Sequence, residues 1–155
     1  MSLSNWKPSN KRTNEDDLLL KYWEKTGGII YTEVLVGKGG VQKWTGDVSP
    51  RRIDGVQIIF PHKINGLPDD IVTFRKRKNF QEFQEVLNNG QVKVIEVKHS
   101  LNRPVLGQVI AGADLMEIEY NLSNIGQIVI CEIGDSALEA VCKKRNIEVW
   151  IPSQK

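Results

Sequence analysis

The sequence predicts an α/β fold in which a central mixed β-sheet is flanked by α-helices. In the C-terminal half, strand-like apolar runs at 92–98, 126–133 and 147–151 alternate with helix-like segments. Such an order requires crossover connections and some parallel pairing. Upstream, the strand-like segments 29–36 and 52–60 follow a helix, so the predicted order is helix, three strands, helix, strand, helix, strand.

Three regions are expected within this fold. Residues 1–12 are polar and contain Pro8, and they are predicted to form a flexible N-terminal arm. Residues 13–155 are predicted to form a single domain, because 155 residues are enough for one core and too few for two comfortable ones. Within that domain, residues from about 61 to 90 are interpreted as an insertion.

The first helix is expected to begin at Thr13 or Asn14, which can cap it. Acidic residues in its first turn favour the positive end of the helix dipole. It should end at about Lys25, because Gly27 and Gly28 follow.

The next two strands are predicted from their β-branched and aromatic residues. The first, 29–36, ends at a glycine-rich turn over 37–40, and a loop is expected over 41–50. The second runs over 52–60 and ends at Pro61, which cannot continue a central strand.

The insertion is predicted to contain turns marked by Gly66 and Pro68, then a basic run, and then a short helix over about 80–87. The basic run comprises Arg75, Lys76, Arg77 and Lys78. It could contact phosphates, but a solvated loop is an equally good interpretation.

The C-terminal half continues with a strand over 92–98. Pro104 suits the first turn of a helix that should reach about Glu119. The run 126–133 is continuously apolar, as expected of a strand covered on both faces. A helix from Asp135 or Ser136 and a last strand over 147–151 complete the fold.

Bulk composition narrows the class of protein only partly. Lys and Arg total 21 and Asp and Glu total 19, and this balance neither requires nor excludes nucleic acid as a partner. Cys131 and Cys142 are interpreted as buried, reduced thiols. No apolar run is long enough for a membrane span and no signal peptide is evident, so the expected location is the cytoplasm.

Three charged residues stand on strands that should otherwise be apolar. Glu96 and Lys98 share one face of their strand because side chains alternate with a period of two, whereas Ile95 and Val97 should point into the core. Asp54 lies on the preceding strand. If the two strands are neighbours, Asp54 and Glu96 can converge.

These residue types suit metal-assisted cleavage of a phosphodiester. Mg²⁺ or Mn²⁺ prefers oxygen ligands, and for Mg²⁺ one or two carboxylates suffice because it keeps several waters. Asp54 and Glu96 would hold the ion, which would activate a water. Lys98 would assist by orienting that water or by stabilising the phosphate.

Asp54 followed by Glu96-Val97-Lys98 resembles the PD-(D/E)xK signature of the nuclease superfamily that has the restriction-endonuclease-like fold. The resemblance extends over about residues 13–133. It implies an Mg²⁺-dependent deoxyribonuclease in which Asp54 and Glu96 are metal ligands, the Val97 carbonyl is a further ligand, and Lys98 is catalytic. The motif order is also similar to that of junction resolvases and transposon-end endonucleases.

The resemblance implies two supporting residues. An N-terminal helix in this superfamily often bears a Glu that assists the metal site. Glu15 is the nearest match, and Glu24 and Glu33 compete for the role. A Gln often lies on the helix after the lysine strand, and Gln108 matches it, although Gln108 also has an ordinary surface interpretation.

Two positions depart from the family pattern. Ile53 stands where a proline is expected before the aspartate, a position that is degenerate in the superfamily. Gly112 stands where the RecB-like branch often has a tyrosine, which argues against close membership of that branch.

DNA is the expected partner. Arg51 and Arg52 are well placed to contact it beside Asp54, although one of them could simply pair with a carboxylate, and the basic run at 75–78 is a second candidate. The resemblance is compatible with a homodimer. Specificity would come from the insertion, the arm, dimer geometry or a partner protein.

Two rival hypotheses remain at this point. One is a nuclease fold that binds nucleic acid without cleaving it, or that serves as a subunit of a larger complex. The other is an unrelated α/β protein with accidental charges at its strand ends.

Overall fold

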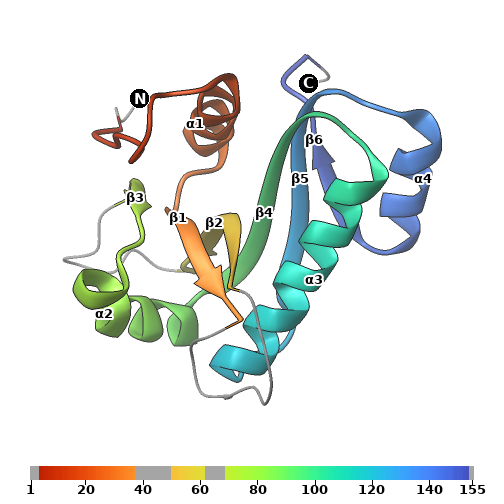
Figure 1. Ribbon diagram of the computed structural model, residues 1–155. Helices are drawn as coiled ribbons and strands as arrows, with labels where there is room; N and C mark the ends of the chain where they lie inside the picture. Colours follow the sequence, from red (N-terminus) through yellow and green to blue (C-terminus); the bar gives the residue numbers. More distant parts are fainter. Residues whose placement is uncertain (1–3, 38–49, 62–68, 154–155) are drawn as a thin grey trace.

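A mixed six-stranded β-sheet forms the centre of the protein (Figure 1). The computed structural model describes residues 4–37, 50–61 and 69–153. In spatial order the strands are β3 (Ile71–Thr73), β1 (Ile29–Val36), β2 (Arg51–Ile59), β4 (Gln91–Ser100), β5 (Gly126–Ile133) and β6 (Ile147–Trp150). β2 is antiparallel to both β1 and β4, and the remaining neighbours are parallel. The predicted α/β class with a mixed sheet is confirmed.

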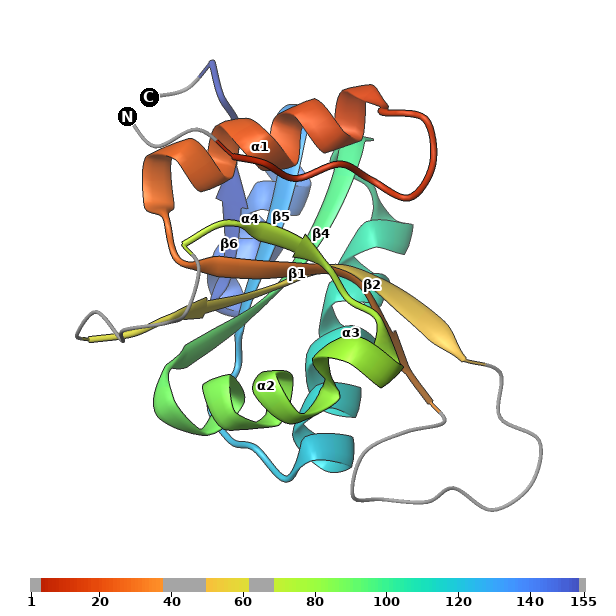
Figure 2. The same ribbon diagram turned by 90° about the vertical axis from the view of Figure 1, so that its left-hand side faces the viewer.

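Helices cover both faces of this sheet (Figures 1 and 2). α1 (Asn14–Thr26) packs on one face, and α2 (Lys76–Asn89), α3 (Arg103–Tyr120) and α4 (Ser136–Lys144) pack on the other. The alternation along β4 shows the division: Ile95 and Val97 belong to the α1 cluster, whereas Val92 and Val94 belong to the α3 cluster. Because both faces are buried, β5 is apolar along most of its length.

The start of α1 is held by a reciprocal cap. The Thr13 hydroxyl accepts from the Asp16 amide at 3.2 Å, and the Thr13 amide donates to Asp16 Oδ2 at 2.8 Å. The cap confirms the predicted helix start. It also places Glu15 in the first turn, on the side of the sheet that α1 covers.

The segment interpreted as an insertion contributes to the core. Residues 71–73 form β3, which was not predicted, and α2 begins at Lys76 instead of near residue 80. Phe83 of α2 is fully buried, with ring centroids 5.0 Å from Tyr31, 4.8 Å from Phe74 and 5.4 Å from Tyr120. α2 therefore closes one end of the core beneath β1.

The basic run does not form a loop, which corrects that part of the prediction. Arg75 is the residue before the helix, and Lys76, Arg77 and Lys78 lie in the first turn of α2. The reason is that Lys and Arg are good helix formers and Phe80, Phe83 and the residues after them supply an apolar face.

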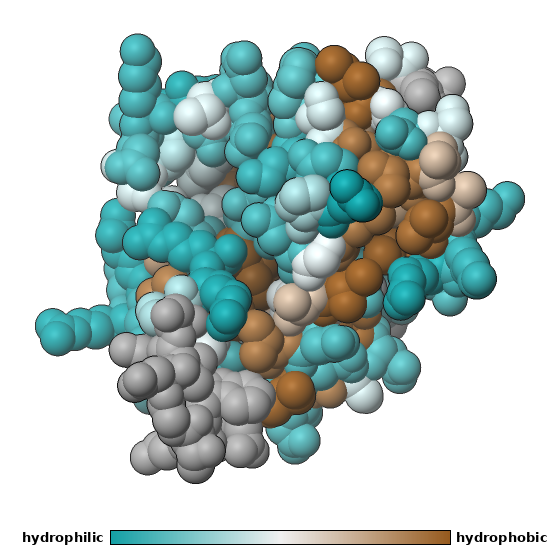
Figure 3. All heavy atoms as spheres, turned by 45° about the vertical axis from the view of Figure 1, so that its right-hand side comes forward, coloured by the Kyte–Doolittle hydropathy of each residue, from teal (hydrophilic) through white to brown (hydrophobic). Residues whose placement is uncertain are grey.

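The two outermost strands of the sheet are short, with three residues in β3 and four in β6. Apolar side chains gather on part of the surface in the view of Figure 3. Exposed large apolar residues include Ile118 of α3, Ile133 of β5 and Val141 of α4. Among the described residues, no helix combines the length and apolarity needed to cross a membrane. The turn predicted at 37–40, the loop at 41–50 and the turns near Gly66 and Pro68 lie wholly or largely outside the described residues.

Truncation of Phe83 tests the contribution of α2 to the core. Phe83→Ala should lower the free energy of unfolding by about 3–5 kcal/mol, because it removes a buried ring from an aromatic cluster. Urea denaturation measures the change, with the partly buried Phe80→Ala as the matched control. Equal losses in the two variants would contradict this role for α2.

Candidate metal and nucleic-acid site

The candidate site lies where β2 separates from β4. The two strands pair from Ile59↔Gln91 to Gly55↔Ile95, and the next pair in this register would be Asp54 with Glu96. Pairing stops there. Instead, Asp54 Oδ2 accepts a hydrogen bond from the Val97 backbone amide at 2.9 Å. The side chain of Asp54 thus replaces the backbone acceptor that the separating strands no longer supply.

The same cross-section of the sheet is distorted on the β1 side. Pairs Thr32↔Gly55 and Val34↔Ile53 flank Glu33, which has a left-handed φ of 58°. A non-glycine residue in this region is uncommon, and such strain typically costs about 1–3 kcal/mol. The distortion thus lies on the strand next to Asp54, in the same register.

The regular alternation of side chains between the two faces of the sheet is also interrupted in β1 and β2 at this point. Tyr31 and Val34 belong to one core cluster although they are three residues apart, and so do Ile53 and Val56. In a regular strand, residues three apart would face opposite sides. Both strands therefore change face between these residues, and Asp54 borders cavities on both faces of the sheet.

Glu96 is a buried carboxyl group beside a second one. Its exposed fraction is 5%, and it lies on the face of β4 that α3 covers. Burial raises the pKa of Glu96 to about 9, and the Asp54 charge and a hydrogen bond with Asp54 contribute further, while Lys98 opposes the shift. The two carboxyl groups therefore converge, as the sequence led us to expect.

A cavity of about 590 Å³ opens in front of these residues on the α3 side. Asp54, Glu96 and Lys98 line it from the strands, and Gln108 lines it from the exposed side of α3. Gly107 and Ala111 border it as well, so few bulky side chains block access from α3. Strand and helix together thus place all four predicted catalytic residues on one cavity.

Gly112 allows α3 to approach the sheet closely beneath the site. A Cβ atom at this position would lie 3.3 Å from Val94 Cγ1 and 3.5 Å from Ile53 Cγ1. α3 therefore packs directly onto β2 and β4 beneath the site, and a large side chain at residue 112 would push the helix away.

Glu15 approaches the site from the opposite face. It borders a second cavity, of about 240 Å³, together with Asp54 and Val97. The pKa of Glu15 is raised, first by burial and then by the Asp54 charge. Glu24 is exposed on α1. Glu33 borders the same cavity but forms an ion pair with Arg52, whereas Glu15 is the member of this trio whose pKa is raised by the Asp54 charge.

The charge balance of the site suits a divalent cation. The buried Glu96 carboxyl group meets the half-buried one of Asp54, and the pKa of Glu96 is raised well above its ordinary 4.5. A cation would relieve this repulsion. Residues 4–37, 50–61 and 69–153 contain no group of three His, Cys, Asp or Glu side chains arranged to hold an ion. The acidic side chains that could hold an ion at this cavity are those of Asp54 and Glu96, and one or two carboxylates suffice for Mg²⁺ because it keeps several waters.

The predicted nucleic-acid contacts divide into two groups. Arg51 and Arg52 are exposed at the start of β2 and line the 590 Å³ cavity. Arg75 lines a third cavity, of about 370 Å³, which it shares with Arg52. The remaining basic residues of the first turn of α2 are exposed and border none of these three cavities: Lys76, Arg77 and Lys78.

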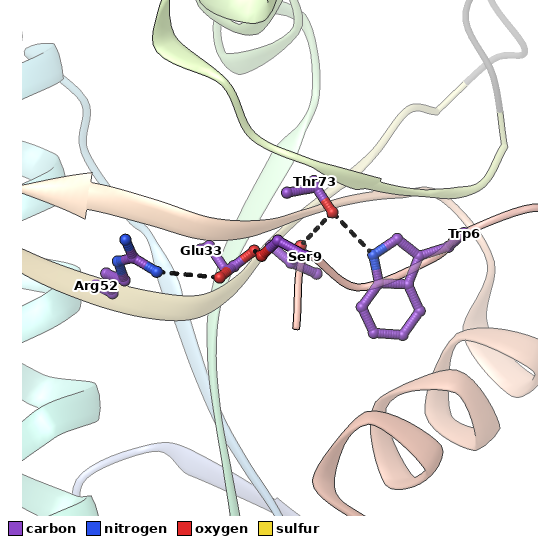
Figure 4. Close-up of polar contacts among 6 residues, drawn as sticks. Trp6, Ser9, Glu33, Arg52 and Thr73 are labelled. Carbon is purple, nitrogen blue, oxygen red and sulfur yellow. Dashed lines mark hydrogen bonds and ion pairs between the residues drawn. The ribbon is translucent and has the colours of Figure 1, made fainter. Parts of the chain in front are cut away.

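The described part of the N-terminal arm contributes residues that the sequence did not single out. Ser4 donates a hydrogen bond to Asp70. The Trp6 indole donates to Thr73 Oγ1 at 3.2 Å, and Ser9 donates to Glu33 (Figure 4). The arm therefore runs beside α1 and above β3 (Figure 2). Its polar composition gave no signal of these contacts.

No family model, curated protein or solved structure matches this chain. Any function must therefore be inferred from the site itself.

The raised pKa of Glu96 predicts a pH dependence of stability. At pH values between the ordinary pKa of 4.5 and the folded-state pKa of about 9, Glu96 holds a proton in the native protein that it has released in the unfolded chain. The free energy of unfolding should therefore fall as pH rises through this window, by up to about 1.4 kcal/mol per pH unit from this group. Glu96→Gln should remove that contribution.

Urea denaturation in EDTA at several pH values across this window measures the effect. The exposed Glu85→Gln variant is the matched control and should keep the wild-type slope. Identical slopes in the wild type and Glu96→Gln would contradict the assignment.

Proposed function

We propose that this protein is a metal-dependent endonuclease of the PD-(D/E)xK type, with the restriction-endonuclease-like fold, which hydrolyses phosphodiester bonds in DNA. The observation that supports it most is the meeting of Asp54, Glu96 and Lys98 on one cavity where β2 leaves β4. A solvated strand face, the ordinary explanation of such charges, would not bury Glu96 to 5% exposure against a second carboxyl group.

Asp54, Glu96 and the Val97 carbonyl are the proposed ligands of Mg²⁺ or Mn²⁺, and Glu15 supports them from the α1 side. When bound, such an ion supplies Lewis acidity that activates water and neutralises charge on the phosphate. The Val97 amide keeps Asp54 oriented through its hydrogen bond to Oδ2.

Lys98 and Gln108 act on the substrate side. Lys98 lies two residues after Glu96 on the same strand, so its ammonium group reaches the cavity as a compact positive charge. There it would hold the attacking water or stabilise the negative charge that develops on the phosphate. Gln108, on α3, would position the same groups by hydrogen bonding.

The proposed substrate is DNA, which would meet Arg51 and Arg52 at the cavity and the basic start of α2 farther along. A homodimer would allow both strands to be cut, and a partner protein could supply sequence preference. We place the enzyme in the cytoplasm, where its two buried free cysteines, Cys131 and Cys142, would stay reduced.

Cation binding should stabilise the folded protein. Mg²⁺ or Mn²⁺ at about 100 times its dissociation constant should add about 2.7 kcal/mol to the free energy of unfolding. Differential scanning fluorimetry at pH 8 measures the rise in Tm, and Asp54→Asn should abolish it. Glu85→Gln should show the wild-type rise, and an equal rise in Asp54→Asn would contradict the ligand assignment.

DNA cleavage tests the activity itself. Wild type should cut at least one of linear, supercoiled, single-stranded or branched DNA in the presence of Mg²⁺ or Mn²⁺. Glu96→Gln and Lys98→Ala should each reduce the rate by about 100-fold or more, because each removes a group that stabilises the transition state. RNA serves as the comparison substrate.

The control variant for this assay is Lys143→Ala, an exposed residue on α4. Failure of the wild type to cut any of these substrates would contradict the enzymatic proposal. Binding without cutting would favour the non-cleaving nucleic-acid-binding module instead.

A further inference from the structure

Glu33 stands at the centre of a polar cluster beside the candidate site. Its Oε1 lies 3.1 Å from Arg52 Nη1, and its Oε2 accepts a hydrogen bond from the Ser9 hydroxyl. Figure 4 shows the carboxylate pointing between these two donors, which come from β2 and from the N-terminal arm. The Glu33 carboxylate thus forms an ion pair with a guanidinium group and accepts a hydrogen bond from a hydroxyl group at the same time.

Those two donors are the kind that bind a phosphate. An Arg guanidinium matches the geometry of phosphate oxygens, and a Ser hydroxyl adds a further hydrogen bond. The adjoining cavity of about 370 Å³ is lined by Ser9, Asn10, Glu33, Arg52 and Arg75, among others. Among the described residues, the Arg75 side chain has no carboxylate within ion-pair distance.

Arg52 connects this cavity with the candidate metal site, because it lines both. Arg52 borders all three cavities, including the one that contains Asp54, Glu96 and Lys98. A nucleic-acid strand with its scissile phosphate beside Lys98 would therefore pass Arg52 on leaving the site. The next phosphate along that strand would approach Ser9 and Arg75.

We infer that Arg52, Ser9 and Arg75 form a second phosphate-binding position for the strand being cut, and that the Glu33 carboxylate occupies this position until nucleic acid displaces it. The inference rests on the proposed function and deepens it. It names a contact next to the scissile phosphate and a residue of this chain that competes with the substrate for that contact.

The exchange is favourable for physical reasons. The Arg52 side chain is 64% exposed and that of Glu33 28%, so water screens their ion pair and its contribution is small. A phosphodiester backbone that takes the place of Glu33 also releases condensed counterions, which favours binding at low salt. Glu33 then loses one cation and one hydroxyl partner and turns to solvent.

The test is a double-mutant cycle on binding. Fluorescence anisotropy measures the Kd of the protein for fluorescein-labelled DNA, single-stranded or duplex, in EDTA, where no cleavage occurs. The DNA has about 20 nucleotides per strand, which is longer than one turn of duplex. Glu33→Gln should tighten binding about two- to fivefold, because it frees Arg52 from its ion pair. Arg52→Gln should weaken binding, and adding Glu33→Gln to Arg52→Gln should then have no effect.

Arg75→Gln completes the set. It should reduce the slope of log K against log salt by about 0.7–0.9, as expected for one lost phosphate contact. Glu85→Gln, which removes the same charge elsewhere on α2, should change Kd less than Glu33→Gln does. Circular dichroism and thermal midpoints establish that each variant is folded.

Three results would overturn the inference: equal effects of Glu33→Gln and Glu85→Gln, an unchanged effect of Glu33→Gln in the Arg52→Gln background, or an unchanged Kd in Arg52→Gln. Parallel cleavage assays with Mg²⁺ separate this failure from failure of the proposed function. If the wild type cuts DNA but the double-mutant cycle shows no coupling between Glu33 and Arg52, only the second phosphate position is overturned. Wild type that binds no nucleic acid overturns both.

Discussion

The hydrogen bond from the Val97 amide to Asp54 Oδ2 is the constraint on which the rest of the site depends. Where β2 leaves β4, a buried backbone donor loses its strand partner, and an unsatisfied donor would be expensive. Asp54 satisfies it and is thereby held against the strand that carries Glu96 and Lys98. The opening between the strands and the position of the carboxylate are thus two aspects of one contact.

The unfavourable features of the fold are concentrated in one cross-section of the sheet. Glu33 has a left-handed backbone, Asp54 sits at the strand separation, and Glu96 is a buried acid with a raised pKa. Each would be unusual in a sheet selected for stability alone. All three lie in one register across β1, β2 and β4, and such a concentration of strained backbone and perturbed acids is typical of functional sites.

The sequence predicted those parts of the molecule that depend on periodicity. The alternation along β4 placed Glu96 and Lys98 on one face, and cap residues located the start of α1. β3 was not predicted because three residues carry no periodic signal. The predicted α2 was too short because its basic first turn is also typical of a loop. Pairing of Arg51 or Arg52 with a carboxylate was an open alternative, but the sequence did not indicate Glu33 as the partner or Ser9 as the second donor, because both contacts are tertiary.

The short outer strands have a consequence for self-association. β3 and β6 offer three and four residues of backbone at the two borders of the sheet. A second copy that continued the sheet would gain few hydrogen bonds, and edge-to-edge growth into larger assemblies is disfavoured for the same reason. Two copies would therefore have to meet through side chains. The exposed apolar side chains of α3 and α4, Ile118 and Val141, offer one such surface.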